Sequence, residues 1–279
     1  MKYRFGLIGY PVTHSLSPWI HAEFMKRAGL NGSYELYEIK PNDSFNNKIK
    51  ELKNEKLNGF NITAPYKKTI MPFLDELDKQ AEAIGAVNTV VNENGKWVGY
   101  NTDGDGYLRS LVSVFPSISS AKYSKIIILG AGGAARAILY TLFENGFKNI
   151  DIANRSLQSA SELKAYYNLR DTRTLTLSEA EKTLGEYDII IQTTSVGMGI
   201  SQFDKIVEIT KLPNSSIVSD IIYKPVKTSF LQQADILGAR IHYGHSMLLY
   251  QAQYAFELWT GIRVPLEKME QDLLKKLEG

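Results

Sequence analysis

One segment of the chain, residues 125–156, constrains the fold more than any other. The apolar run Lys125–Leu129 is typical of a strand buried on both faces, and Gly130-Ala131-Gly132-Gly133-Ala134-Ala135 follows it directly. A helical pattern comes next, then a glycine stop at Gly146 and a second strand pattern, Asn149–Ala153. This order of strand, small-residue loop, helix and strand predicts a βαβ unit of a doubly wound α/β sheet.

The small residues of this loop suit a dinucleotide. Gly130 permits a tight turn, Gly132 lets the backbone approach a pyrophosphate, and Ala135 lets helix and strand pack closely. The helix N-terminus then faces the phosphates. The alternative is a glycine loop that only turns a strand into a helix, and the complete βαβ context disfavours it. The candidate cofactor-binding residues of the loop are Gly130, Ala131, Gly132, Gly133 and Ala134.

The end of the second strand indicates which dinucleotide is bound. An NAD-binding version carries Asp or Glu there to hold the ribose hydroxyls, but this chain has Asn154-Arg155-Ser156. Arg155 can stack on the adenine and pair with a 2′-phosphate, with hydrogen bonds from Asn154 and Ser156. We therefore expect NADP(H) as the cofactor, the alternative being a solvated surface arginine.

Length and composition limit the remaining possibilities. A chain of 279 residues favours two domains, and its net charge of +2 argues against nucleic acid as a partner. The absence of cysteine excludes disulfides and thiolate chemistry and agrees with a cytoplasmic location. No apolar run approaches the ~20 residues that span a bilayer, so no membrane association is expected. The four histidines lack carboxylates at metal-ligand spacing, so no metal site is expected; they are His14, His21, His242 and His245.

The first hundred residues predict a separate α/β layer. Strand patterns at Arg4–Ile8, Tyr34–Ile39 and Gly59–Thr63 alternate with helical patterns. Asn94-Gly95, between two β-rich runs, predicts a two-residue hairpin turn.

A helix is expected after the first strand. Ser17 is its predicted N-cap, Pro18 suits the first turn, and Gly29 fits just past its end. Free N–H groups near Ser15 and Ser17 would favour a substrate carboxylate, and capping by Ser17 is the compatible alternative.

Polar clusters follow several strands or loops of this layer. Ligands of open α/β sheets bind beyond the carboxyl ends of the strands, so these clusters are candidates to surround one small polyhydroxylated substrate. They are Ser15–Pro18, Asn61–Lys67, Asn88-Thr89 and Asn101–Asp103.

These clusters, the Gly130 loop and Asn154-Arg155-Ser156, together with Asp220-Ile221-Ile222-Tyr223 and Met247–Gln251, make the chain resemble the shikimate dehydrogenase family in order over nearly its whole length. The resemblance implies NADPH-dependent, reversible reduction of 3-dehydroshikimate to shikimate in aromatic amino-acid biosynthesis. It also implies an N-terminal α/β substrate domain (residues 1–103 and 243–279, the C-terminal helices returning to it) and a Rossmann-type NADP-binding domain (residues 104–242).

The resemblance further implies roles for single residues. Lys67 matches the catalytic acid/base and Asp103 its partner, while Ile221 and Gly244 are further cofactor candidates. Ser15, Ser17, Thr63, Asn88, Tyr223 and Gln251 match residues that hold substrate, and Asn61 is added from its cluster.

The chemistry of the two charged residues agrees with this assignment. Reduction of a carbonyl needs a hydride at carbon and a proton at oxygen, and an ammonium at Lys67 can polarise and protonate that oxygen. Asp103 would orient Lys67 and a substrate hydroxyl. Taken singly, each would be a solvated surface charge, and only the accompanying motifs favour the catalytic interpretation.

Two rival functions stay open. A relative in the same superfamily would act on quinate or use NAD, and a ligand-sensing module would bind shikimate and dinucleotide without turnover. We expect a monomer or homodimer with a small-molecule substrate.

Overall fold

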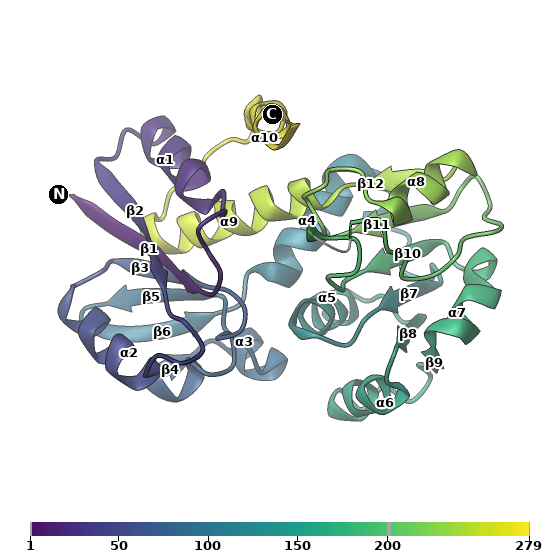
Figure 1. The fold of residues 1–279 in the computed structure, drawn as a ribbon, viewed down its shortest axis with the longest axis horizontal. Coiled ribbons are helices and arrows are strands. Elements are labelled where there is room, and N and C mark those ends of the chain that lie inside the picture. Colours follow the sequence, from purple (N-terminus) through teal and green to yellow (C-terminus); the bar gives the residue numbers. More distant parts are fainter. Residues whose placement is uncertain (1, 200–201, 279) are drawn as a thin grey trace. The chain divides into compact units, whose positions relative to one another are not determined.

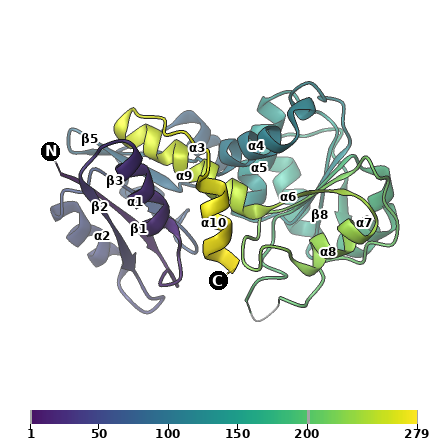
Figure 2. The ribbon, with the colours of Figure 1, turned by 90° about the horizontal axis from the view of Figure 1, so that it is seen from above.

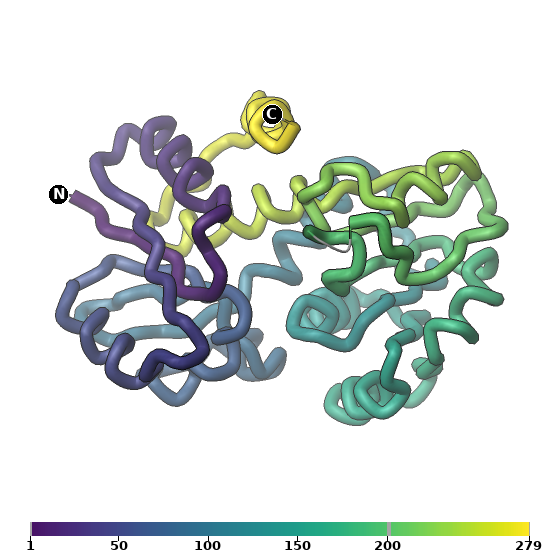
Figure 3. The backbone as a smooth tube through the Cα atoms, viewed as in Figure 1, coloured from purple at the N-terminus to yellow at the C-terminus, as the bar shows by residue number. Residues whose placement is uncertain are grey.

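The computed structural model describes residues 2–199 and 202–278 and divides into two compact units. Unit 1 contains the residues up to Gly106 together with Gln251–Pro265, and unit 2 contains Tyr107–Tyr250 together with the residues from Leu266 on. The divisions at Gly106 and Gln251 fall inside two helices, α4 (Asp103–Val114) and α9 (Gly244–Thr260). Figure 3 traces the backbone, coloured by residue number. Each unit contains its own six-stranded sheet.

Unit 1 contains a mixed sheet in the order β2-β1-β3-β5-β6-β4 (Figure 1). β1, β2 and β3 are parallel, whereas β5 runs antiparallel to both β3 and β6. The predicted hairpin turn joins β5 to β6, with positive φ at Asn94 and Gly95, and is confirmed. The strands are β1 (Tyr3–Gly9), β2 (Gly32–Glu38), β3 (Gly59–Ile62), β4 (Glu76–Leu77), β5 (Thr89–Glu93) and β6 (Lys96–Tyr100), and the helices are α1 (Ser17–Arg27), α2 (Phe45–Asn54), α3 (Lys79–Ile84) and a 3₁₀ turn at Met71–Phe73.

Both faces of this sheet are covered by helices. Successive side chains of a strand point to opposite faces, so each strand contributes residues to both packed layers. On one face, Phe5 stacks on Trp259 of α9, and Phe24 of α1 contacts Phe256. Figure 2 shows α1 and α9 along this face. On the other face, Ile8 and other strand residues pack with Ile49 of α2 in a second buried cluster.

Unit 2 contains a fully parallel sheet in the order β12-β11-β10-β7-β8-β9. Read from β9, this is the 3-2-1-4-5-6 order of dinucleotide-binding folds. The predicted β7 therefore lies at the centre of the sheet, with the predicted β8 beside it, and the Rossmann-type prediction is confirmed. The strands are β7 (Ile126–Leu129), β8 (Ile150–Asn154), β9 (Thr174–Thr176), β10 (Ile189–Gln192), β11 (Ile217–Asp220) and β12 (Arg240–His242).

Helices cover both faces of the parallel sheet. Alternate residues of β7 divide between two buried clusters, Ile126 and Ile128 in one and Ile127 and Leu129 in the other. The first cluster includes side chains of α4, α5 and α6, and the second includes side chains of α7 and α8. The helices are α5 (Gly133–Glu144), α6 (Leu157–Tyr166), α7 (Leu177–Thr183), α8 (Ser229–Ile236) and α10 (Met269–Glu278), with 3₁₀ turns at Pro116–Ser119 and Leu184–Glu186.

The C-terminal helix groups with unit 2, whereas the family resemblance implied that residues 243–279 belong to the substrate domain. Glu270 on α10 accepts a hydrogen bond from the Ser246 hydroxyl and lies 3.5 Å from Nε2 of the buried His245. Both partners belong to the first turn of α9. These contacts hold α10 beside the part of α9 that lies in unit 2.

Among the described residues, no helix has both the length and the apolar character needed to cross a membrane.

Candidate active site

Polar residues of unit 1 meet at one edge of its sheet. The chain leaves β3 at this edge and soon reaches Lys67. Because β5 is antiparallel to β3, its first residue, Thr89, and the preceding Asn88 lie at the same edge. β6 is antiparallel to β5, so its exit brings Asn101–Asp103 back to that edge. The strand directions thus bring three separate polar clusters together.

A lysine–aspartate pair is the centre of this group. Nζ of Lys67 donates to Oδ2 of Asp103 at 2.5 Å, and the two side chains are 25% and 9% exposed. The other carboxylate oxygen of Asp103 accepts from Nδ2 of Asn88 at 2.8 Å. The Lys67 carbonyl accepts from the backbone N–H of Val87 at 2.8 Å, which ties the lysine to the segment before β5. A cation held this way, with a quarter of its side chain exposed, can offer a proton to a bound ligand.

The two serines at the start of α1 differ from their predicted arrangement. The N-cap of α1 is Leu16, which makes no side-chain capping bond, and Ser17 is the first helical residue, so the predicted capping by Ser17 is wrong. Ser15 Oγ takes over part of that function, because it accepts from the backbone N–H of Ser17 at 3.2 Å. Ser15 Oγ also donates to Ser17 Oγ at 3.1 Å. Gly29 follows the helix with positive φ, as predicted.

Close backbone approaches set the positions of two further candidates in unit 1. A Cβ added to Gly9 would lie 2.2 Å from the Thr63 methyl group, so the exits of β1 and β3 are in tight contact. A Cβ at Gly106 would lie 2.6 Å from the Gln251 backbone nitrogen. The backbone of Gln251 on α9 therefore packs closely against Gly106 of α4. Gly106 lies three residues after Asp103 on the same helix.

In unit 2, the glycine loop lies where the strand order of the sheet reverses, between β7 and β10. Gly130 has φ of 122°, and a Cβ there would lie 2.4 Å from Oγ1 of Thr193, the residue that follows β10. Gly132 is the N-cap of α5 and has no side-chain capping bond. A Cβ at Gly132 or Gly133 would meet nothing within 4 Å. The open space and the uncapped N–H groups suit the pyrophosphate of a dinucleotide.

The tip of β8 presents one cation. Arg155 is exposed, and within the described part of the chain no ion pair engages it. Its neighbours are used locally: Asn154 Nδ2 donates to the Ser156 carbonyl at 3.1 Å, and Ser156 Oγ caps α6. This arrangement shapes the tip and leaves the guanidinium available for an anion.

The segment after β11 is held at several points. The Asp220 carboxylate accepts from the Ile222 N–H at 2.9 Å and from Oγ1 of Thr228 at 2.7 Å, and burial raises the pKa of Asp220 to about 7. A Cβ at Gly244 would lie 2.4 Å from the Ile221 carbonyl group. Glycine at position 244 thus allows α9 to start directly against the Ile221 backbone. Tyr223 follows in the same segment and is partly buried.

Sequence reasoning missed several residues around the Lys67–Asp103 pair. Tyr34, Thr89 and Thr102 are buried and hydrogen-bonded to Asn61 or Asn88. Thr89 and Thr102 fall inside clusters noted in the sequence, but nothing singled them out within those clusters. Tyr34 carried no signal, because an aromatic residue in a strand is typical of any sheet.

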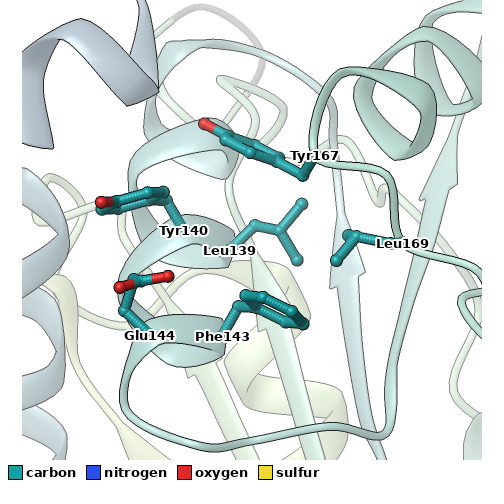
Figure 4. A pocket seen from close by; sticks show the side chains of 6 residues that line it. All are labelled: Leu139, Tyr140, Phe143, Glu144, Tyr167 and Leu169. Atoms are coloured by element: carbon teal, nitrogen blue, oxygen red, sulfur yellow. The ribbon is translucent and has the colours of Figure 1, made fainter.

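A small pocket in unit 2 involves none of the predicted site residues (Figure 4). It lies between α5 and the segment that includes the end of α6, and its lining residues are Leu139, Tyr140, Phe143, Glu144, Tyr167 and Leu169.

Among the described residues, no group of three or more histidine and acidic side chains is arranged to hold a metal ion.

A doubly wound parallel sheet with an uncapped glycine loop at its switch point, in a chain that also contains a lysine paired with a buried aspartate, defines a class: α/β oxidoreductases that use a nicotinamide dinucleotide. Family models agree and are more specific. The shikimate dehydrogenase substrate binding domain matches residues 7–90, shikimate / quinate 5-dehydrogenase matches residues 113–225, and the shikimate 5′-dehydrogenase C-terminal domain matches residues 244–274. The chain belongs to the shikimate dehydrogenase family.

Individual relatives support this assignment over the full length. Shikimate dehydrogenase (NADP(+)) of Oceanobacillus iheyensis is 48% identical over 279 residues, which is 100% of both chains. Shikimate 5-dehydrogenase of Thermus thermophilus, solved with NADP(H) and shikimate, is 32% identical with a TM-score of 0.85, covering 99% of this chain and 100% of that one. Quinate dehydrogenase of Corynebacterium glutamicum, solved with NAD, is 27% identical with a TM-score of 0.89, covering 98% and 99%.

Proposed function

We propose that this chain is an NADP-dependent shikimate dehydrogenase that reversibly reduces 3-dehydroshikimate to shikimate in aromatic amino-acid biosynthesis. The observation that carries the proposal is the Lys67–Asp103 pair, in which a partly exposed ammonium is held by a buried carboxylate. The full-length similarity to a relative named shikimate dehydrogenase (NADP(+)) supports the substrate and the cofactor.

Lys67 is the proposed proton donor. Reduction of the substrate carbonyl places negative charge on its oxygen, and the Lys67 ammonium neutralises that charge by giving up a proton. Asp103 holds the ammonium in place and accepts a hydrogen bond from a substrate hydroxyl. NADPH, when bound, supplies the hydride to the carbonyl carbon.

The remaining predicted substrate residues are hydroxyl and amide groups. They recognise a hydroxylated ring by hydrogen bonds, and the two serines at the start of α1 bind the carboxylate. The N-terminus of α1, whose N-cap Leu16 makes no side-chain capping bond, favours an anion there. The proposed substrate-binding residues are Ser15, Ser17, Asn61, Thr63, Asn88, Tyr223 and Gln251.

The proposed cofactor-binding residues belong to unit 2. The backbone of the glycine loop binds the pyrophosphate, and Arg155 pairs with the 2′-phosphate that distinguishes NADP from NAD. The strand tip around Arg155 has no carboxylate of the kind that binds a ribose 2′-hydroxyl. The full set is Gly130, Ala131, Gly132, Gly133, Ala134, Asn154, Arg155, Ser156, Ile221 and Gly244.

We assign substrate binding to the N-terminal domain and NADP binding to the Rossmann-type domain of unit 2. A cytoplasmic location and a monomeric or homodimeric state complete the proposal; the lack of cysteine in the sequence supports the location.

Steady-state assays test this function. We expect NADP⁺ reduction with shikimate, slower turnover with quinate or with NAD⁺, and loss of about 100-fold or more in kcat for Lys67→Ala. Lys68→Ala is the control, because Lys68 is an exposed neighbour. Faster turnover of quinate with NAD⁺ would instead assign the chain to quinate dehydrogenases. Stoichiometric binding of shikimate without turnover would identify a sensing module and refute the enzyme.

A further inference from the structure

A chain of hydrogen bonds connects buried residues of three strands to the Lys67–Asp103 pair. Tyr34 lies on β2, Asn61 on β3 and Thr89 on β5, and these three side chains are between 0% and 9% exposed. The bonds run through Asn88 to Asp103. The direction of each bond follows from what its groups can donate or accept.

The amide of Asn88 has one possible orientation. The backbone N–H of Thr102 lies 2.8 Å from Oδ1 of Asn88, and a backbone N–H can only donate, so that atom must be the oxygen. The amide nitrogen of Asn88 therefore faces Asp103 and donates to Oδ1 of its carboxylate at 2.8 Å.

The hydroxyl of Thr89 must donate to Asn88. Its Oγ1 lies 2.9 Å from the Asn88 amide oxygen, which can only accept. Once the single hydroxyl proton of Thr89 is used in this way, its oxygen is left as an acceptor. It accepts from Nδ2 of Asn61 at 3.0 Å.

The amide of Asn61 is oriented by an independent contact. Its Nδ2 lies 3.2 Å from the backbone carbonyl of Asn88, and a carbonyl can only accept. The Asn61 oxygen therefore faces Tyr34, whose hydroxyl must donate to it at 2.8 Å. Burial raises the pKa of Tyr34, so the hydroxyl keeps its proton and remains a donor.

The resulting chain has a single direction. Tyr34 donates to Asn61, Asn61 to Thr89, Thr89 to Asn88, and Asn88 to Asp103, where the carboxylate is the final acceptor. Its first member is held by packing, because the Tyr34 ring stacks on His21 with centroids 4.5 Å apart and an interplanar angle of 4°. In a buried site, hydrogen bonds aligned in this way polarise one another and strengthen the last bond.

We propose that Tyr34, Asn61 and Thr89 are positioning residues that act through Asn88 to hold the Asp103 carboxylate in the orientation that accepts from Lys67. One oxygen of Asp103 then stays bound to Asn88 while the other stays bound to Lys67. This inference rests on the proposed catalytic role of the pair. It also gives Asn61 a positioning role inside the protein, beside its proposed contact with substrate, because both ends of its amide make hydrogen bonds to neighbouring residues.

Two substitutions of Thr89 separate its hydroxyl from its shape. Thr89→Val keeps the volume but removes the hydroxyl, and Thr89→Ser keeps the hydroxyl but removes the methyl group. We expect kcat for shikimate oxidation to fall about 10-fold in Thr89→Val, as expected when a buried partner is left unsatisfied. We expect Thr89→Ser to stay within about 3-fold of wild type, and the KM for NADP⁺ to be unchanged in both. Wild-type kcat in Thr89→Val, or an equal loss in Thr89→Ser, would overturn the inference.

Two tyrosines of β2 test the first bond of the hydrogen-bond chain, from Tyr34 to Asn61. They keep the inference testable if Thr89→Val does not fold. Tyr34→Phe keeps the ring but removes the donor to Asn61, so we expect a lower kcat with an unchanged KM for NADP⁺. Tyr37→Phe is the control, because the Tyr37 hydroxyl donates to Glu55 at 2.9 Å, outside the chain of bonds. Equal rates in the two variants would contradict the inference. Wild-type protein that does not turn over shikimate would instead refute the proposed function.

Discussion

The surroundings of a charged side chain decide its function more than its type does. Lys67 and Asp103 would each be solvated if they stood alone, yet the carboxylate is 9% exposed and accepts from both a lysine and an asparagine. A buried carboxylate needs such partners, because the loss of its water shell is costly. Arg155 differs from these two residues, because it is exposed and has no ion pair within the described residues. It lies at the tip of β8 and is proposed to bind the 2′-phosphate of NADP.

Removing Arg155 is expected to change cofactor preference. A charge-assisted hydrogen bond contributes about 1.5–3 kcal/mol, so Arg155→Ala is expected to raise the KM for NADP⁺ about 10- to 100-fold and to leave the KM for NAD⁺ nearly unchanged. Steady-state kinetics with both cofactors measures this. Arg170→Ala, an exposed arginine of the same unit, is the control. An unchanged preference in Arg155→Ala would remove Arg155 from the cofactor site.

At the level of elements, the turn from β7 into α5 contains glycines with different requirements. Gly130 needs positive φ and has a neighbour 2.4 Å from where a Cβ would lie, whereas Gly132 has φ of −81° and open space. We expect Gly130→Ala to lower the free energy of unfolding by about 1–3 kcal/mol. Gly132→Ala is expected to leave stability within about 0.5 kcal/mol while weakening NADP⁺ binding, because the methyl group enters the space for the pyrophosphate.

Urea unfolding and NADP⁺ titration measure these two effects. Equal destabilisation by both substitutions would contradict the prediction for Gly132. It would show that glycine is required there by the backbone geometry of the loop and not by the space for the pyrophosphate.

Two buried histidines join elements and make stability depend on pH. His242 on β12 contacts Ser219 of β11 at 2.8 Å and Ser110 of α4 at 3.2 Å, and His21 on α1 stacks on Tyr34 of β2. Burial lowers the pKa of His242 to about 4 and that of His21 to about 3. Both pKa values lie below the ordinary value of 6.5, so below pH 6.5 the unfolded chain binds protons that the folded chain does not.

The contribution of these two histidines to stability is therefore full above about pH 6.5 and is lost as pH falls from there toward about 4. Each histidine contributes a slope of about 1.4 kcal/mol per pH unit in this range. Urea unfolding at pH 7, 6 and 5 measures the slope. His242→Asn is expected to reduce it, while His14→Asn, at an exposed position, leaves it unchanged. An unchanged slope in His242→Asn would mean that His242 is protonated in the folded protein.

At the scale of the whole molecule, the two units contain separate sheets with separate buried clusters. The proposed substrate residues lie mainly in unit 1, and the proposed cofactor residues lie in unit 2. A ligand that binds a unit lowers the rate at which that unit opens locally.

Hydrogen exchange tests this division directly. We expect shikimate to protect peptides covering residues 59–70 and 86–103, and NADP⁺ to protect peptides covering residues 126–136 and 150–157. Peptides of α2, residues 45–54, serve as an internal control and are expected to be unaffected by either ligand. Protection of residues 126–136 by shikimate alone would contradict the assignment of the two ligands to the two units.

The sequence by itself determined the elements whose signals are local. The turn at Asn94-Gly95, the strand–glycine–helix unit around Gly130 and the parallel sheet of unit 2 were all predicted correctly, because hydrophobic period and turn chemistry depend on residues close together in the chain. The exception is Ser17. Its residue type favoured the N-cap, but the helix begins one residue earlier, and Ser15 contacts the first N–H.

Only the tertiary structure decided which distant residues meet. The hydrogen bonds that connect Tyr34 to Asp103 include three between residues 27, 28 and 15 positions apart in the sequence. Their order follows from strand directions that no local pattern records. The approach of Gly244 to Ile221 is of the same kind. Hydrogen-bond direction depends on which donor faces which acceptor, so the sequence could name Lys67, Asp103 and Asn88 as a group, whereas the packing of three strands determined what holds them in place.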